Sequence, residues 1–227
     1  LDRAGVSAPR TGSAKFFITI EGVRHYFGIY TMVEPVDKSF LTKRFGRDAN
    51  DGNLYKSLFG DSGRATLERI EDVPEKMFPE RRVIGSKDWR TNYRPTYDLK
   101  TNEDEADHTV LINFINNLNS LSGSDLKSYL DKNFRVKEFL MAQAVNVLLG
   151  KWDDYWTMGN NYYLYFNNRG KIEFIPVDYD MVFGHAFPII ATDTVGIYDW
   201  PNIVNDFVST FTGIPVETLN LMHTWGS

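Results

Sequence analysis

Apolar and polar positions alternate most clearly near the amino terminus, in the stretch AKFFITIEGVRHYFGIYTMVE. Two β-rich runs flank the turn signal Glu21-Gly22, which predicts an antiparallel pair of strands. The next stretch, PVDKSFLTKRFG, carries apolar residues on one helical face and predicts a helix that opens at Pro35 and closes at Gly46. A short strand is then predicted in GNLYKSLF. The chain up to about residue 60 is therefore expected to be rich in β-structure.

A helical pattern starts after Asp107. Apolar residues recur at helical spacing in HTVLINFINNLNSL, DLKSYLD and VKEFLMAQAVNVLLG, which predicts a block of helices. NYYLYF and IEFIPV, joined by the turn NNRGK, then predict a β-hairpin. Residues 60–97 lack a sustained period and predict a loop with short elements, and residues 185–227 show a helical pattern only around IVNDFVSTF. These patterns indicate one α+β unit.

Composition narrows the class of protein. The chain has 227 residues, of which 42% are hydrophobic, enough for a folded core. Its formal net charge of −5 disfavours nucleic acid and acidic membrane surfaces as partners. No apolar run approaches the roughly 18 to 20 residues of a transmembrane helix, so none is predicted. The absence of cysteine excludes disulfides, thiolate nucleophiles and cysteine-based metal sites.

Oxygen ligands are concentrated in residues 150–184, GKWDDYWTMGNNYYLYFNNRGKIEFIPVDYDMVFG. Asp178 and Asp180 follow the second hairpin strand, and both carboxylates point to one side if the strand continues through them. Two such carboxylates can hold a hard cation. Magnesium suits them better than zinc, because the span offers carboxylates and amides but neither thiolates nor a histidine pair.

The order of these residues suggests phosphoryl transfer. An apolar helix is followed by a loop with Asp153 and Asp154, then Asn161, a hairpin, and Asp178. Protein kinases use this order, because one aspartate meets the acceptor hydroxyl while an asparagine and a second aspartate hold metal on the phosphates. Two alternatives stay open at this point. Asp and Asn are common in turns for structural reasons, and nucleotide-sugar transferases also hold a divalent cation with an Asp-X-Asp pair.

Several sequence blocks resemble the CotH kinase family, the spore coat protein H type. They are YFGIYTMVEPVDKSFLTKRFG, GNLYK, YDLKTNEDEADHTVLINFINNLN, GKWDDYW with NNYYLYF, and KIEFIPVDYDMVFG, in order over about residues 4–184. The resemblance implies an α+β, atypical protein-kinase-like fold that binds ATP with Mg²⁺ or Mn²⁺ and phosphorylates Ser or Thr of proteins. We expect a β-rich nucleotide lobe over residues 1–100, with part of that lobe upstream of residue 1, and a helical lobe over residues 101–227.

The resemblance also assigns roles to the acidic residues. Asp153 matches the catalytic aspartate of the family's W-D block, and Asp154 remains a rival because the loop is longer than the family pattern. Asn161 matches an asparagine that helps to hold metal. Asp178 matches the metal-binding aspartate, with Asp180 supporting it.

For the nucleotide phosphates, a kinase needs a lysine fixed by a glutamate. Lys56 and Glu34 lie in family blocks and are expected to meet across the β-rich lobe, with Lys15 as the alternative lysine. The chain departs from ordinary kinases, since it has no G-X-G-X-X-G loop, no HRD and no literal DFG.

The family also suggests partners and a location. Bacterial members act in spore-coat assembly, which implies a Ser/Thr-containing coat or surface protein as substrate and a spore-coat, cell-surface or secreted location. Related fungal members are associated with adhesion, so the competing class is a kinase-like binding module whose partner is a host-cell receptor. Keeping Asp153, Asn161 and Asp178 favours the enzyme, because a scaffold has no physical need for three converging oxygen ligands.

Overall fold

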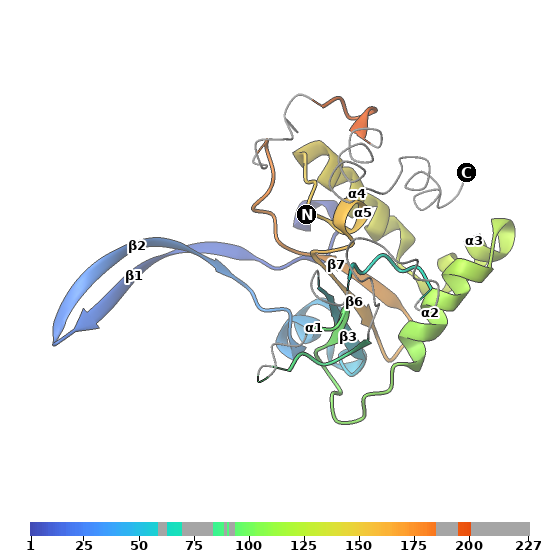
Figure 1. Ribbon diagram of the computed structural model, residues 1–227, viewed down its shortest axis with the longest axis horizontal. Coiled ribbons are helices and arrows are strands. Elements are labelled where there is room, and N and C mark those ends of the chain that lie inside the picture. Colours follow the sequence, from blue (N-terminus) through green and yellow to red (C-terminus); the bar gives the residue numbers. More distant parts are fainter. Residues whose placement is uncertain (59–62, 70–83, 89, 91–93, 185–194, 201–227) are drawn as a thin grey trace.

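The structure is a computed structural model, and it describes residues 1–58, 63–69, 84–88, 90, 94–184 and 195–200 (Figure 1). Its strands are β1 (Thr11–Ile20), β2 (Val23–Val33), β3 (Asn53–Ser57), β4 (Ile84–Gly85), β5 (Tyr97–Leu99), β6 (Tyr162–Phe166) and β7 (Ile172–Pro176). Its α-helices are α1 (Lys38–Phe45), α2 (Thr109–Ser120), α3 (Gly123–Asn133), α4 (Val136–Leu149) and α5 (Tyr155–Met158). Single 3-10 turns, η1 (Asp2–Ala4) and η2 (Arg47–Ala49), complete the described elements. The predicted α+β class is confirmed.

The described strands form two separate sheets. One is a five-stranded sheet in the order β4-β5-β3-β6-β7, in which only the β4–β5 pair is parallel. β3 lies at its centre, because Lys56 is opposite Asp98 of β5 on one side and opposite Tyr163 of β6 on the other. This sheet takes strands from both sides of residue 100, and the division into lobes at that residue stays a prediction.

One face of this sheet packs against α2, α3 and α4. Alternate strand residues point to this face, as the pleat requires, and they are buried among apolar residues of α2. The buried members of this core are Val6, Tyr55, Ala65, Leu67, Tyr97, Leu99, Leu111, Phe114, Ile115, Leu118, Ala142, Tyr162, Leu164, Phe166, Ile172 and Phe174. Burial of each large apolar side chain stabilises the fold by about 1.5–3 kcal/mol.

The opposite face of the sheet packs against α1. Leu54, Tyr165 and Ile175 contact Phe40 and Leu41 of that helix in a smaller core. The helix predicted between Pro35 and Gly46 is confirmed, and its start is now defined. The Asp37 carboxylate accepts a hydrogen bond from the Phe40 N–H at 2.9 Å, so Asp37 is the N-cap and the helix begins at Lys38.

The strands β1 and β2 form a two-stranded ribbon that extends away from the rest of the molecule (Figure 1). The predicted antiparallel pair is confirmed, with its turn at Glu21 and Gly22. Large apolar side chains on both faces of the ribbon are exposed, among them Ile29 at 67% and Met32 at 61%. Most of the apolar surface of the ribbon therefore meets solvent in this chain.

The block of helices is confirmed in α2, α3 and α4, and the predicted hairpin in β6 and β7. Within residues 60–97, the described elements are the short β4 and β5. The helical pattern in IVNDFVSTF lies outside the described residues. Among the helices that the structure describes, none is long and apolar enough to cross a membrane.

Candidate active site

Two segments meet beside the β6–β7 hairpin. The first, residues 150–161, leaves α4 at Gly150, whose φ of 67° is a left-handed conformation that glycine adopts without steric cost. The second, residues 177–184, follows β7. The Val177 N–H donates a hydrogen bond to the Asn161 carbonyl at 3.0 Å, which fixes the two segments side by side.

Asp154 is a buried structural residue in this arrangement. Its carboxylate caps α5, accepting a hydrogen bond from the Thr157 N–H at 3.1 Å and another from the Asn146 side chain at 3.0 Å. Burial raises its pKa to about 6, although attraction to Lys151 and these hydrogen bonds oppose the rise. Both oxygens are used inside the protein, which disfavours Asp154 as the residue that meets a substrate.

Asp153 is in a more accessible position. It is partly exposed, and its pKa is raised by burial while attraction to Lys151 and a hydrogen bond from the Asn161 side chain lower it. The negative charge of Asp178 also raises this pKa, so the two carboxylates lie within electrostatic range of each other. Of the two adjacent aspartates, Asp153 is therefore better placed to face a ligand.

Asp178 and Asn161 both adopt left-handed backbone conformations, with φ of 61° and 56°. Asn and Asp tolerate this region better than most residues, but it still costs free energy, and strained backbone positions tend to cluster at functional sites. The Asn161 amide nitrogen donates to the Asp153 carbonyl at 3.1 Å, so the oxygen of the same amide is the atom it offers to a cation.

One sequence expectation about the acidic pair is wrong. β7 ends at Pro176, and the left-handed Asp178 means that the strand does not continue through Asp178 and Asp180. Both side chains are exposed, but strand alternation does not place them on one side. The pair is brought to the site by the bend after β7.

Lys56 approaches the same place from β3. Its pKa is lowered by burial and by repulsion from Lys100, while attraction to Asp178 and Asp98 raises it. Its ammonium group lies 5.9 Å from the centre of the Tyr163 ring. The structure thus brings Lys56 within electrostatic range of Asp178, across the end of the sheet.

The expected pairing of Lys56 with Glu34 is not what the structure shows. In the part of the chain that it describes, Glu34 is paired with Arg10 at 2.7 Å and Arg44 at 3.1 Å, with Lys43 at 3.8 Å. The hydrogen bond from Arg10 leads the causes that lower the Glu34 pKa to about 2. Glu34 thus secures the base of the ribbon.

The buried acid nearest to Lys56 in the sheet is Asp98, directly opposite it in β5. Asp98 is 1% exposed, forms an ion pair with Lys100, and accepts a hydrogen bond from the Lys87 N–H at 2.9 Å. The alternative lysine, Lys15, is exposed on the projecting β1. Lys15 has no described contact with the two segments.

Lys151 is a further residue of this site that the sequence patterns did not reveal. Its side chain is fully buried, yet it lies within electrostatic range of four carboxylates: Asp154, Asp153, Asp178 and Asp180. Its ammonium donates a hydrogen bond to the Val177 carbonyl at 2.6 Å and lies 4.2 Å from the centre of the Tyr179 ring. A lysine between an apolar helix and an Asp-Asp pair, in GKWDD, is the signal that could have revealed it.

The donor set suits a magnesium ion that arrives with its substrate. The described residues contain no group of three or more His, Asp or Glu side chains that could hold a metal alone. Mg²⁺ is commonly held by one or two carboxylates together with substrate phosphates and water. Asp178 and the amide oxygen of Asn161 meet that smaller requirement, with Asp180 two residues away.

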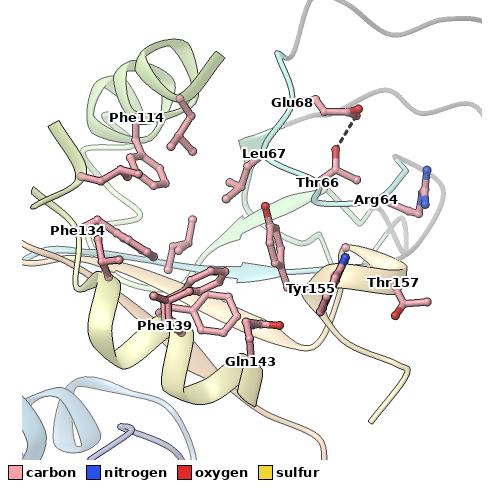
Figure 2. Close-up of a pocket in the computed structure, with 18 residues that line it drawn as sticks. Arg64, Thr66, Leu67, Glu68, Phe114, Phe134, Phe139, Gln143, Tyr155 and Thr157 are labelled. Carbon is pink, nitrogen blue, oxygen red and sulfur yellow. Dashed lines mark hydrogen bonds between the residues drawn. The ribbon is translucent and has the colours of Figure 1, made fainter. Parts of the chain in front are cut away.

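An apolar cavity of about 360 Å³ is lined in part by Tyr155, Trp156 and Thr157 of the first segment (Figure 2). Figure 2 shows Phe114, Phe134 and Phe139 around it. It opens on the sheet face that carries Leu164 and Phe174, whereas Lys56 and Tyr163 point to the other face. The candidate acids and Lys56 do not line it.

A family model described as CotH kinase protein matches residues 1–207. The chain belongs to the CotH kinase protein family. No curated protein and no solved structure matches it. Family membership makes this CotH chain a kinase-like protein. The resemblance that the sequence blocks suggested is confirmed, and kinase activity is the activity that the family's name suggests.

Proposed function

We propose that this CotH protein is a metal-dependent protein kinase that transfers the γ-phosphate of ATP to Ser or Thr hydroxyls. One observation carries the proposal. The hydrogen bond from the Val177 N–H to the Asn161 carbonyl holds the segments of Asp153 and Asp178 side by side, and Asp178 lies within electrostatic range of both Asp153 and Lys56. In phosphoryl transfer, such groups position the acceptor hydroxyl and the nucleotide and compensate the negative charge of the phosphates.

Each group has a role that its surroundings support. Asp153 orients the acceptor hydroxyl and accepts its proton, as a partly exposed carboxylate can. Lys56 binds phosphate oxygens of ATP, with Asp98 opposite it in the sheet. Asp178 and Asn161 hold the divalent cation, with Asp180 in support. When bound, that cation neutralises charge on the phosphates.

Family membership supports a proposal for the acceptor protein and for the location. A Ser/Thr-containing protein of a spore coat or cell surface is the proposed substrate, and the coat or surface is the proposed location of the kinase. The composition of the chain contributes one negative criterion. The net charge of −5 disfavours strongly acidic acceptors.

Label transfer from γ-labelled ATP to a mixture of acceptor proteins, followed by phosphoamino acid analysis, tests the proposal. We expect phosphoserine and phosphothreonine, and at least a 100-fold slower transfer for Lys56→Met. Lys127→Met is the matched control, because Lys127 is an exposed lysine of α3. Labelling only of tyrosine would contradict the Ser/Thr proposal, and labelling from a sugar nucleotide instead would contradict the kinase.

A second function is favoured by the exposed apolar ribbon. Phe16, Tyr26 and Phe27 are 48%, 55% and 57% exposed, which is unusual for aromatic side chains on a single ribbon. Such a surface suits adhesion to another protein. Adhesion that persists in an Asp178→Ala variant without phosphate transfer would favour the binding module over the kinase.

A further inference from the structure

Lys151 occupies an exceptional place for a lysine. Its side chain is 0% exposed, and lysine is almost never fully buried unless it is paired. Burying an ammonium group is strongly unfavourable unless hydrogen bonds and opposite charges compensate it. The compensation comes from both segments of the candidate site, so the burial of Lys151 depends on their relative position.

The hydrogen bond from Lys151 is directed at a critical peptide group. Its acceptor is the carbonyl of Val177, and that carbonyl belongs to the peptide that joins Val177 to Asp178. The orientation of this peptide sets the φ angle of Asp178, which is left-handed at 61°. A strained conformation persists only where its surroundings hold it. Lys151 supplies such a hold directly.

A chain of hydrogen bonds through Asn146 also supports Lys151. The Tyr179 hydroxyl donates a hydrogen bond to the side-chain oxygen of Asn146 at 2.7 Å. The side-chain nitrogen of Asn146 donates another to the Asp154 carboxylate at 3.0 Å. The Lys151 N–H donates to the Asn146 backbone carbonyl at 2.8 Å. Asn146 thus links α4 to both segments.

We infer that Lys151 is a positioning residue that holds Asp178 in its metal-binding conformation by orienting the 177–178 peptide. This inference rests on the proposed function only for the identity of the bound cation. The hydrogen bond from Lys151 and the conformation of Asp178 do not depend on that function. A lysine placed only to balance charge would be an obstacle to a cation, because an ammonium group repels Mg²⁺ or Mn²⁺. The two roles predict opposite effects when the ammonium group is removed.

Mn²⁺ binding to the whole chain, measured by electron paramagnetic resonance, distinguishes these two roles of Lys151. Lys151→Met keeps an unbranched side chain that is one atom shorter and removes the charge. The positioning role predicts at least tenfold weaker Mn²⁺ binding, with or without ATP. Binding that is unchanged or tighter would overturn the inference. Lys127→Met is the control and should bind Mn²⁺ as the wild type does.

A chemical rescue gives a second test, because the chain contains no cysteine. Lys151→Cys is alkylated with bromoethylamine in the unfolded state, which restores an ammonium group on a side chain of nearly the same length. Mn²⁺ binding should recover to within about threefold of wild type. A refolded, alkylated protein that binds Mn²⁺ as weakly as Lys151→Met would contradict a role for the ammonium group.

The wild-type protein provides a measurement that does not depend on any variant folding. With ¹⁵N-labelled lysine side chains, the buried Lys151 should give an ammonium resonance that is protected from solvent exchange and broadened by Mn²⁺. Absence of such a resonance would overturn the inference. The wild type could fail to transfer phosphate while Lys151→Met still binds Mn²⁺ more weakly than the wild type. That result would support the inference about Lys151 and contradict the proposed kinase activity.

Discussion

Asp153 and Asp154 are adjacent in sequence but have different tasks at the scale of single residues. Asp154 is 3% exposed and has both oxygens engaged by the backbone of α5 and by Asn146. Asp153 is partly exposed and lies within electrostatic range of Lys151 and Asp178. Asp154 therefore stabilises the fold as the N-cap of α5, and the partly exposed Asp153 is the candidate for the proposed chemistry.

This division predicts separate effects of two substitutions. Asp154→Ala removes an N-cap and leaves the Asn146 amide without its acceptor, which should lower the free energy of unfolding by about 1–3 kcal/mol. Asp153→Asn should leave that free energy within about 0.5 kcal/mol and lower kcat by at least 100-fold. Urea unfolding and label transfer on the same samples measure both effects. Equal stability losses in the two variants would contradict the division.

The pKa of Asp154 also makes a prediction about stability and pH. Its folded pKa of about 6 lies above its ordinary value of 3.8, so the folded state holds this proton more tightly than the unfolded state does. Protonated Asp154 therefore adds up to about 3 kcal/mol to the free energy of unfolding below pH 4, and this stabilisation is lost as pH rises through 6.

Asp154→Asn should remove that loss. The free energy of unfolding of the variant, measured relative to wild type in urea, should rise between pH 4 and pH 7. Altered hydrogen bonds add only a constant offset, which does not change with pH. A difference that stays flat over this range would show that Asp154 is ionised at an ordinary pKa in the folded protein.

At the scale of elements, the base of the ribbon depends on Glu34. This carboxylate follows β2 and is paired with Arg10 before β1 and Arg44 of α1, so it joins three parts of the chain. Its pKa of about 2 lies below the ordinary 4.5, chiefly through the hydrogen bond from Arg10. The stability it contributes is present above pH 4.5 and is lost as pH falls toward 2.

Glu34→Gln should therefore destabilise the chain at pH 7 by about 1 kcal/mol and have little effect near pH 2. Thermal unfolding at the two pH values gives the comparison. Lys38→Gln is a suitable control, because Lys38 forms an exposed ion pair with Asp51 and should have almost no effect. An effect of Glu34→Gln that is equal at both pH values would show that its charge is not what matters.

Most elements were predictable from the sequence, because their signals are local. The turn at Glu21-Gly22, the amphipathic helices and the β6–β7 hairpin are each set by neighbouring residues. The partners of Glu34 and the burial of Lys151 were not predictable, since they depend on which distant segments the fold brings together. The conformation of Asp178 was not predictable for the same reason. β7 ends just before Val177, whose N–H donates a hydrogen bond to Asn161 and whose carbonyl accepts one from Lys151.

At the scale of the whole molecule, the exposed ribbon contrasts with the packed sheet. Ile29 and Met32 are 67% and 61% exposed, while Leu164 in β6 is 1% exposed between sheet and helices. Ile29→Thr and Met32→Thr should each change the free energy of unfolding by no more than about 0.5 kcal/mol. Leu164→Ala should cost about 2–5 kcal/mol.

Urea unfolding of the three variants tests this contrast. A loss of more than 2 kcal/mol from Ile29→Thr would mean that the ribbon is buried in solution. The same samples, followed by sedimentation, show whether the apolar ribbon promotes self-association. Reduced association of the Thr variants is expected if it does.

We propose that Asp153, Asp178 and Lys56 form one phosphoryl-transfer site in this CotH kinase protein. The most direct measurement is the rate of transfer from γ-labelled ATP with Mg²⁺ or Mn²⁺, for wild type beside Asp178→Ala. We predict transfer by the wild type that depends on the divalent cation, and at least a 100-fold loss in Asp178→Ala. The stability of this variant should fall by no more than about 1–2 kcal/mol, because Ala adopts the left-handed conformation of residue 178 less readily than Asp. Equal transfer by both proteins, or no transfer and no thermal stabilisation of the wild type by ATP and metal, would contradict the claim.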